Sequence, residues 1–519
     1  MKLNYKRTIL VGFAFFLISA FWQAYDATIP VILTNKFGMS QGWSGVIMAL
    51  DKILAVFMLP LFGALSDKCL SKHGKRTPFI TIGTIVAAVA LIGLSFVDNA
   101  QLKNISDVSA FDQQTTLEVI YDTQMNEKLQ TPEGEGFVLA DLYTRDEFIK
   151  ITSTVTDPET NKSVTNEEYT NYVVPARQAY AAAKTAENPT PLILFVVLLL
   201  VILVAMSIFR SPAVALMPDV TIKPLRSKGN AVINLMGTAG GIIVLVLGMV
   251  FATSAVKNQL MNYNVYYLVI SGIMLGALVV FLTTVREPAW SKQMQEDSLL
   301  YGVEEEQEET GEKRALTGAE KRSLIFILAS IALWYFGYNA VTSKYAVYAG
   351  NILNMDYNTT LLIAQGAAIV AYLPAGMIAS KVGRKKTIMA GVVMLTVAFA
   401  AASFLRAGSS VLLMNVLFAL AGIGWATINV NSFPVVVEMC SGADIGKYTG
   451  FYYTASMSAQ IVTPMLSGVL MDMDGIGMTV LFPYAAVFAG LAFVTMIFVK
   501  HGDAKPEVKN GLEALDIDD

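Results

Sequence analysis

Long runs of mostly apolar residues with few charges recur along this 519-residue chain and constrain its fold more than any other feature. A helix that satisfies its own backbone hydrogen bonds needs about 20 apolar residues to cross the hydrocarbon core of a bilayer. Charged residues make up only 15% of the chain, against roughly 25% in soluble domains. Twelve such runs lie near residues 8–30, 42–66, 78–97, 191–216, 230–254, 264–285, 322–345, 359–380, 386–405, 410–434, 448–471 and 478–499. We therefore predict an all-α membrane protein with twelve transmembrane helices.

The distribution of Lys and Arg predicts the orientation of these helices, because positive charge in short loops resists translocation. Basic residues cluster in the loops at 68–76 and 381–386, on the same side as the N-terminus. The short segments and helix ends of the opposite side contain Lys36, Lys257, Lys344 and Arg406. We therefore predict that the N- and C-termini are both cytoplasmic.

Two long polar segments divide the chain. Residues 98–190 form an extracytoplasmic insertion between the third and fourth predicted helices, and residues 287–321 form a cytoplasmic linker between two sets of six. We predict an N-terminal six-helix bundle from 1–97 and 191–286, a C-terminal six-helix bundle from 322–500, and a cytoplasmic tail from 501–519. The acidic run at 304–309 is interpreted as solvated linker, with a docking site as the alternative.

The two predicted bundles carry related motifs at equivalent positions. The second predicted helix ends with Leu-Pro-Leu-Phe-Gly-Ala-Leu-Ser-Asp at 59–67, followed by Gly-Lys-Arg-Thr at 74–77. The eighth ends with Leu-Pro-Ala-Gly at 373–376, followed by Gly-Arg-Lys-Lys-Thr at 383–387. Such a duplication around a central cytoplasmic loop is typical of transporters in which two bundles rock about a site at the membrane midplane.

These motifs resemble the major facilitator superfamily, whose hallmark between helices 2 and 3 is Gly-x-x-x-Asp followed by a basic loop. Residues 60–67 and 74–80 are similar to the plant sucrose/proton symporters and to the glycoside-pentoside-hexuronide:cation symporters. A second match is Ser-Pro-Ala-Val-Ala-Leu-Met-Pro-Asp at 211–219, with Gly-Asn-Ala at 229–231. The resemblance implies the major facilitator fold and coupled transport of a sugar or glycoside.

The chain also departs from the glycoside:cation symporters. Melibiose permease coordinates sodium with carboxylates of helix 2, and the corresponding positions here are Ala55 and Leu59. Sodium coupling of that kind is therefore not expected. The same family places an Asp before an Ile-Pro pair in helix 4, where this chain has Arg210 before Ser211 and Pro212. We expect helix 4 to offer substrate a hydrogen-bond donor.

Charged residues inside the first six predicted helices are candidates for binding and coupling, because each such charge costs roughly 2.5–3.5 kcal/mol at a helix centre. Asp26 follows Trp22 by four residues, so carboxylate and ring share a face with Gln23 close by. A carboxylate beside an aromatic ring suits a sugar, since the carboxylate accepts hydroxyl protons while the ring covers C–H surface. The alternative is a solvated Asp at the exterior interface.

The second predicted helix carries two adjacent charges, Asp51 and Lys52. Adjacent side chains point roughly 100° apart on a helix, so we expect them to reach different neighbours rather than each other. Asp51 is the candidate proton-binding group, with a structural ion pair as the alternative, and Lys52 either snorkels or pairs.

Arg210 is interpreted as a group that exchanges partners between a protonatable acid and the substrate, or as an arginine of the cytoplasmic interface.

Uncharged polar and aromatic residues replace these charges in the second set of helices. Helix 7 carries Trp334, Tyr338 and Asn339, and helix 10 carries Trp425, Asn429 and Ser432 at i, i+4 and i+7. Such a face suits a polyol, through stacking and neutral hydrogen bonds. Trp and Tyr are equally common in cores and at lipid interfaces, which is the competing interpretation. Gln365 and Gln460 are weaker candidates.

The motif after helix 2 is interpreted as part of a cytoplasmic gate. Gly63 permits close helix approach, and Asp67 is placed to pair with Arg76 or to face the start of helix 11 near residues 447–448. Lys75 and the equivalent Arg384 of the second bundle belong to the same basic loops. The alternative is that these basic residues only keep the loops inside.

The sequence contains no metal-ligand cluster, phosphate-binding loop or nucleophile arrangement, so we expect neither an enzyme nor a cofactor. The net charge of −4 gives no reason to expect a nucleic-acid partner. We predict a multi-pass cell-membrane symporter that carries a sugar or glycoside with a proton by alternating access. Alternatives are a facilitator or exporter of another polar metabolite, or a non-transporting sensor that uses residues 98–190. That insertion is interpreted as partly folded, with a helix that includes the Ala-rich stretch at 176–183 and leads into the fourth predicted membrane helix. It is interpreted as a passive decoration in preference to a cap over the exterior vestibule.

Overall fold

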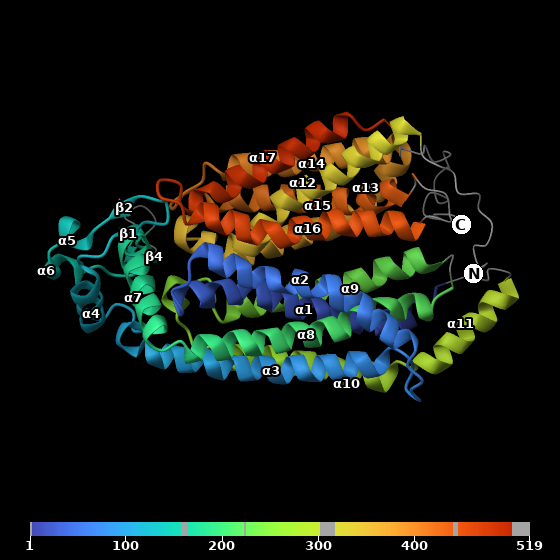
Figure 1. Ribbon diagram of the computed structural model, residues 1–519, viewed down its shortest axis with the longest axis horizontal. Coiled ribbons are helices and arrows are strands. Elements are labelled where there is room, and N and C mark those ends of the chain that lie inside the picture. Colours follow the sequence, from blue (N-terminus) through green and yellow to red (C-terminus); the bar gives the residue numbers. More distant parts are fainter. Residues whose placement is uncertain are drawn as a thin grey trace.

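The computed structural model describes residues 3–156, 161, 163–222, 225–301, 317–437, 439 and 445–500. Long helices run side by side along the molecule, and a small domain of short helices and strands closes one end (Figure 1). Helix α1 begins, and helix α17 ends, at the opposite end from that small domain (Figure 1).

The long helices coincide with the predicted apolar runs, and most of their ends agree to within a few residues. The exceptions are α1, which ends at Asn35 and not near 30, and α3, which continues to Asn104 and so includes the first residues of the predicted insertion. In the first half they are α1 (Tyr5–Asn35), α2 (Gln41–Asp67), α3 (Thr77–Asn104), α8 (Thr190–Asp219), α9 (Arg226–Val250) and α10 (Asn264–Thr284). In the second half they are α12 (Gly318–Tyr348), α13 (Tyr357–Val382), α14 (Arg384–Ala402), α15 (Val411–Val437), α16 (Ile445–Met471) and α17 (Leu481–Ile497). Within the described part of the chain, ten of these are long and apolar enough to cross a membrane; α13 and α16 are the other two.

Local sequence explains where several of these helices begin. Ser40 caps α2 by accepting a hydrogen bond from a backbone N–H of the first turn, and Asp356 caps α13 in the same way. Thr317 and Glu320 form a capping box at the start of α12. Proline lies in the first turn of α3 and of α8, where its missing N–H leaves no helical hydrogen bond unmade.

Each half packs around its own apolar core, and the halves meet along the pairs α2–α16, α9–α13 and α1–α12. Glycine allows the closest of these approaches. An added Cβ at Gly45 of α2 would lie 1.9 Å from the carbonyl oxygen of Pro464 in α16, and one at Gly468 would lie 2.2 Å from that of Gln41. These contacts involve the first turns of α2 and the last turns of α16. The two halves are therefore closed against each other at the end that carries the small domain.

The small domain is formed by the predicted insertion. It contains η1 (Ser106–Val108), α4 (Gln114–Gln124), α5 (Leu139–Leu142), α6 (Arg145–Phe148), η2 (Tyr169–Val173) and α7 (Val174–Glu187). Two antiparallel hairpins complete it, β1 (Leu129–Gln130) with β2 (Gly136–Phe137), and β3 (Thr154–Thr156) with β4 (Ser163–Thr165). Helix α7 leads into α8, in agreement with the helix predicted before the fourth membrane run.

The linker between the two halves begins with a helix that the sequence analysis did not specify. Residues Glu287–Tyr301 form helix α11, which projects beyond the bundle at the end away from the small domain (Figure 1). Glu287 is buried, and its carboxylate accepts hydrogen bonds from the backbone N–H groups of Arg76 and Thr77. The acidic run at 304–309 lies outside the described residues.

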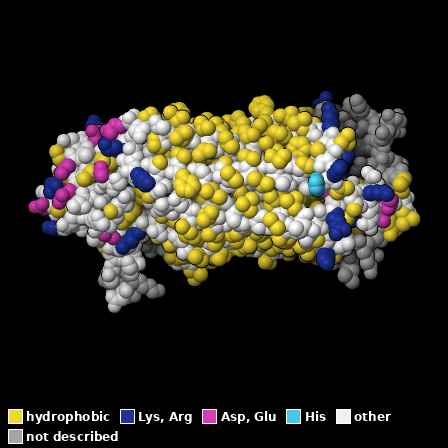
Figure 2. Space-filling view, turned by 90° about the horizontal axis from the view of Figure 1, so that it is seen from below, with side chains coloured by type: hydrophobic (Ala, Val, Ile, Leu, Met, Phe, Trp, Pro, Cys, Tyr) yellow, Lys and Arg dark blue, Asp and Glu magenta, His cyan; other side chains and the backbone are white. Residues whose placement is uncertain are grey.

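The outer surface agrees with a membrane location. Figure 2 shows a broad band of hydrophobic side chains over the helices, with Lys and Arg gathered toward its two ends. Charged side chains of both signs lie over the small domain at one of these ends.

Candidate substrate and coupling site

Trp22 of α1 lies at the meeting point of three helices of the first half. The Lys52 ammonium, from α2, lies 5.0 Å from the Trp22 ring centroid, and the Arg210 guanidinium carbon, from α8, lies 5.9 Å from it. Both distances fit cation–π contacts. The sequence-predicted residues Trp22, Lys52 and Arg210 are thus brought together around one indole ring.

Asp51 and Lys52 form an ion pair, which contradicts the prediction that they point to different neighbours. Asp51 is buried, whereas the Lys52 side chain keeps 25% of its surface exposed. The prediction failed because the angular rule applies to Cβ atoms, and the flexible four-carbon stem of lysine lets its ammonium fold back to the adjacent residue. The pair satisfies two charges that would otherwise be costly inside the bundle.

Asp26 faces the same cluster from α1. Its carboxylate interacts electrostatically with Lys52 and Asp51, and across the junction of the two halves with Tyr338 of α12. Arg210 interacts in the same manner with Asp51 and, in the second half, with Tyr453 of α16. Two carboxylates and two cations therefore balance when all are ionised, and both ends of the cluster reach the second half.

Two buried polar atoms at this cluster lack a hydrogen-bond partner among the described residues, the Trp22 Nε1–H and the Tyr25 hydroxyl. An unpaired buried polar group costs roughly 1–3 kcal/mol, so both groups are suited to bind a ligand oxygen. Sequence reasoning missed Tyr25. Its spacing of three residues from Trp22, which places both on one helix face, was the available signal.

Aromatic side chains form the facing wall in the second half. The rings of Tyr338 and Trp425 stack with centroids 3.6 Å apart and planes 3° from parallel. Tyr335 lies edge-on to Trp425 at 5.3 Å, and its hydroxyl lies 3.4 Å from that of Tyr452. The Tyr452 hydroxyl is also within 3.2 Å of the Ser432 hydroxyl. Tyr338, Trp425 and Ser432 were predicted, whereas Tyr335 and Tyr452 were missed.

The remaining candidates of the second half are placed less directly for binding. Asn339 donates its amide to the Tyr335 carbonyl one turn earlier, at 2.9 Å. Asn429 is exposed and donates to the Tyr372 hydroxyl at 3.3 Å. Trp334 is fully buried in the apolar core, as the competing interpretation held.

A pair of amides links the two halves beside the charged cluster. Gln365 of α13 donates a 2.6 Å hydrogen bond to the Gln23 side-chain oxygen of α1. The same pair lies against Gly241 of α9, where an added Cβ would approach the Gln365 oxygen to 3.2 Å. Gln23 and Gln365 therefore form a contact between the two halves, a pairing that the sequence alone did not predict.

The proposed gate motif forms an ionic network at the end away from the small domain. Arg76 donates to Asp67 at 2.5 Å and to Asp219 at 2.7 Å, and it also contacts the Ser66 hydroxyl. An added Cβ at Gly63 would lie 3.0 Å from the Ser211 hydroxyl, so α2 and α8 approach closely there.

This network joins elements of the first half to one another. Arg76 and Thr77, at the start of α3, are bound to α2, α8 and α11, and Lys75 beside them is exposed. Arg384 begins α14 in the other half. The alternative contact near residue 447 involves a side chain outside the described residues. The role of the motif as a gate stays a prediction; Asp219 and Glu287 are network members that the sequence did not reveal.

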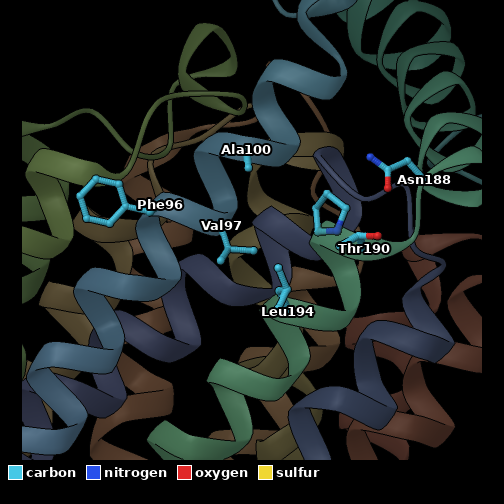
Figure 3. A pocket seen from close by; sticks show the side chains of 7 residues that line it. Phe96, Val97, Ala100, Asn188, Thr190 and Leu194 are labelled. Atoms are coloured by element: carbon cyan, nitrogen blue, oxygen red, sulfur yellow. The ribbon is translucent and has the colours of Figure 1, made fainter.

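An apolar hollow of about 500 Å³ lies between the adjoining ends of α3 and α8, next to the small domain (Figure 3). Its lining is Phe96, Val97, Ala100, Asn188, Thr190, Pro191 and Leu194. This lining is too apolar to bind a polar solute. The cluster around Trp22, with charge on one wall and aromatic rings on the other, is therefore the candidate site.

Comparison with known families assigns the class. The model of the Major Facilitator Superfamily matches residues 178–371 and 357–515, and the model of the MFS/sugar transport protein family matches residues 10–103. The chain belongs to the Major Facilitator Superfamily. It is a multi-pass membrane protein and a secondary transporter, not an enzyme, which confirms the resemblance noted in the sequence.

Similar proteins include sugar transporters, but over short segments. The chain is 33% identical over 72 residues to the sucrose transport protein SUC4 of Arabidopsis thaliana, which covers 14% of either chain. It is 30% identical over 71 residues to the putative glycoside/cation symporter YagG of Escherichia coli, covering 14% of this chain and 15% of that one. These matches span about one seventh of each relative.

Solved structures share the fold along almost the whole chain. The inward-open xylose transporter XylE of E. coli superposes with a TM-score of 0.57 at 14% identity, covering 95% of this chain and 96% of that one. The nucleoside transporter NupG superposes with a TM-score of 0.53 at 15% identity, covering 96% and 100%. At this identity the similarity establishes the fold alone.

Proposed function

We propose that this chain is a proton-coupled symporter of a sugar or glycoside that works by alternating access. The observation that carries the proposal is the composition of the site. A charge-balanced cluster of Asp26, Asp51, Lys52 and Arg210 faces a stacked pair of aromatic rings, Tyr338 and Trp425. Sugar hydroxyls suit the charged wall, and the C–H faces of a sugar ring suit the aromatic wall.

The ion pair of Asp51 and Lys52 gives the coupling step a physical basis. Protonation of Asp51 would neutralise the carboxylate and leave the Lys52 ammonium without its partner. A half-buried cation without a partner is still costly, so Lys52 would turn to Asp26 or to a substrate oxygen. Proton binding and substrate binding would then stabilise each other, which is the requirement for symport.

The sequence matches to sucrose and glycoside transporters support a sugar as the substrate class. We further propose that α13 and α16 cross the membrane together with the ten strongly apolar helices, which gives twelve spans. The clustering of Lys and Arg in the loops at 68–76 and 381–386 supports cytoplasmic termini.

Uptake of labelled disaccharides into vesicles, with and without an inward proton gradient, tests this function. In wild-type vesicles the gradient should drive accumulation. Asp51→Asn should still bind and equilibrate the sugar, but it should no longer concentrate it. Asp146→Asn, an exposed change in the small domain, is the matched control and should accumulate normally. Gradient-driven accumulation by Asp51→Asn would exclude Asp51 as the coupling acid.

A screen of thermal stabilisation by candidate sugars identifies the substrate independently of coupling. A ligand that binds only the folded protein raises its melting temperature, by an amount that grows with concentration over the dissociation constant. Trp22→Ala should abolish the shift, because it removes both the ring and the unpaired Nε1–H. Stabilisation by nucleosides or peptides and not by sugars would instead favour the facilitator or exporter of another polar metabolite.

A further inference from the structure

The small exterior domain is built firmly onto the first half of the transporter. Its apolar core, which includes Leu117 and Phe148, also contains Val256 and Leu260 from the loop between α9 and α10. Polar contacts add to this apolar interface, among them a 2.7 Å hydrogen bond from Gln178 of α7 to Asn35, at the end of α1, and a 3.0 Å bond between Gln101 of α3 and Thr185 of α7. The domain must therefore move with the first half.

The same domain reaches across to the second half through one hairpin. We call residues 129–137, which include β1 and β2, the exterior hairpin; its turn docks on the α16–α17 loop, residues 473–478. The Gly475 N–H donates to the Gly134 carbonyl at 2.8 Å, and the Met478 N–H donates to the Pro132 carbonyl at 2.7 Å. The Gln130 side chain adds a 3.0 Å hydrogen bond to the Met473 carbonyl.

Glycine makes this docking close enough for backbone hydrogen bonds. Gly134 and Gly477 both have positive φ, at +95° and +62°. A Cβ on Gly477 would lie 2.3 Å from the backbone of Glu133 and Gly134, and a Cβ on Gly134 would lie 2.6 Å from the Gly477 nitrogen. Any larger residue at either position would separate the two segments.

Two further polar contacts extend this link. Glu133 pairs with Arg406, in the loop between α14 and α15, at 3.1 Å. Thr170 of η2 donates to the Asn354 side chain, which follows η5 (Ala349–Leu353), at 3.2 Å. The exterior domain thus touches three loops of the second half.

We propose that the exterior hairpin is a latch that stabilises the outward-closed arrangement and undocks whenever the exterior opens. The asymmetry of the two interfaces carries this inference. The domain holds the first half through a shared apolar core, whereas among the described residues it holds the second half through backbone and side-chain hydrogen bonds and one ion pair, which water can replace. Rocking of the halves must break the second interface, because the first moves as one body.

A second set of contacts beneath the hairpin opens in the same motion. Asp472, at the end of α16, accepts the N–H groups of Gln41 and Gly42 at 2.7 and 2.6 Å, and so caps the start of α2. Lys344 of α12 is fully buried and donates to the Gln41 carbonyl at 2.6 Å. The latch lies directly over the junction that alternating access has to separate.

The latch requires the rocking motion of the superfamily, but neither the substrate nor the proton proposed above, so the two proposals can fail separately. Its test measures exterior opening directly. Ser44 follows Gln41 by three residues in α2, so the two share a helix face, and Ser44 is fully buried. In a chain with Cys69→Ser and Cys440→Ser, Ser44→Cys should react with a membrane-impermeant maleimide only when the exterior opens.

Gly477→Ala should raise the rate of that reaction by about tenfold, because losing a few hydrogen bonds of ordinary net strength shifts the equilibrium by that order. Gly136→Ala is the matched control, since it lies in the same hairpin and its added methyl would meet nothing closer than 4.0 Å. Equal rates in Gly477→Ala, Gly136→Ala and the parent would overturn the latch.

A cross-link gives the opposite perturbation and does not depend on a destabilised variant. Hydrogen-bonded residues such as Pro132 and Met478 have Cα atoms roughly 5 Å apart, within disulfide range. Oxidation of Pro132→Cys/Met478→Cys should suppress exterior labelling of Ser44→Cys, and reduction should restore it. Val155→Cys/Val164→Cys joins β3 to β4 within the domain and should have no effect. Unchanged labelling with the Pro132–Met478 bridge fully formed would refute the latch.

Discussion

Gly45 offers a sharp test of the junction between the two halves. In the structure, where the two halves are closed at the end that carries the small domain, an added Cβ at this position would lie 1.9 Å from the Pro464 carbonyl oxygen. Relief to even a tight contact requires α2 and α16 to separate by about 1 Å, as judged from that distance. The added Cβ is held in place by the α2 backbone and the oxygen belongs to the α16 backbone, so no flexible side chain can yield instead.

Overpacking of this kind costs about 1–3 kcal/mol. Gly45→Ala should impose that cost on the outward-closed state alone, because α2 and α16 separate when the exterior opens. A cost of about 2 kcal/mol shifts the equilibrium roughly 30-fold toward the outward-open state. The variant should therefore bind exterior substrate but deliver it slowly to the cytoplasm.

Maleimide labelling of Met48→Cys, a buried position one turn further along α2, reads this shift from outside. Gly276→Ala in α10 is the matched control, since its added methyl would meet no heavy atom within 4 Å. If Gly45→Ala labels no faster than Gly276→Ala and transports at the same rate, α2 and α16 do not separate there and the reasoning is wrong.

Three further predictions concern stability, the exterior domain and the ionic network around Arg76. Asp98→Asn should lower the free energy of unfolding in detergent by about 3–5 kcal/mol, because it leaves the fully buried Lys36 ammonium, which lies 2.7 Å from the carboxylate, without its ionic partner. The double change Lys36→Met/Asp98→Leu should recover most of that loss, because it removes both charges. Burial opposes ionisation of Asp112, but its hydrogen bonds and its ion pair with Lys257 outweigh burial and lower its pKa. The carboxylate should therefore contribute to the thermal stability of the exterior domain at neutral pH, and this contribution should fall as the pH drops through the lowered pKa. Asp112→Asn should remove that pH dependence of the melting temperature. Arg76→Lys keeps the positive charge but loses the planar guanidinium that binds two carboxylates at once, so the melting temperature should fall. An unchanged melting temperature would show that the network does not stabilise the fold.

The long helices could be predicted from sequence because a membrane span needs only length and apolarity, which are local properties. Helix α11 escaped the same reasoning, since it is short, polar and held by the buried carboxylate of Glu287 against the start of α3. The small domain showed the same limit. Its helix α7 was evident from its alanines, whereas its docking on the second half depends on loops that lie at least 184 residues further along the chain.

The candidate site was predicted residue by residue but not pair by pair. Trp22, Asp51 and Arg210 could be singled out because polar groups in apolar runs are conspicuous. Their partners were not, because neighbours across helices depend on rotation and tilt that one sequence does not specify. The bond from Gln365 to Gln23 and the approach of Tyr453 to Arg210 are contacts of that kind.

The uneven division of the site has a consequence for how such a transporter could diversify. All four ionisable groups of the cluster belong to the first half, and the facing wall from the second half is aromatic and neutral. If this cluster couples transport as proposed, substitutions in α12 and α15 would change which solute fits without disturbing the ionisable groups. Under this arrangement, paralogues could keep the first half, with its ionisable groups, and differ mainly in the side chains that the second half presents to the solute.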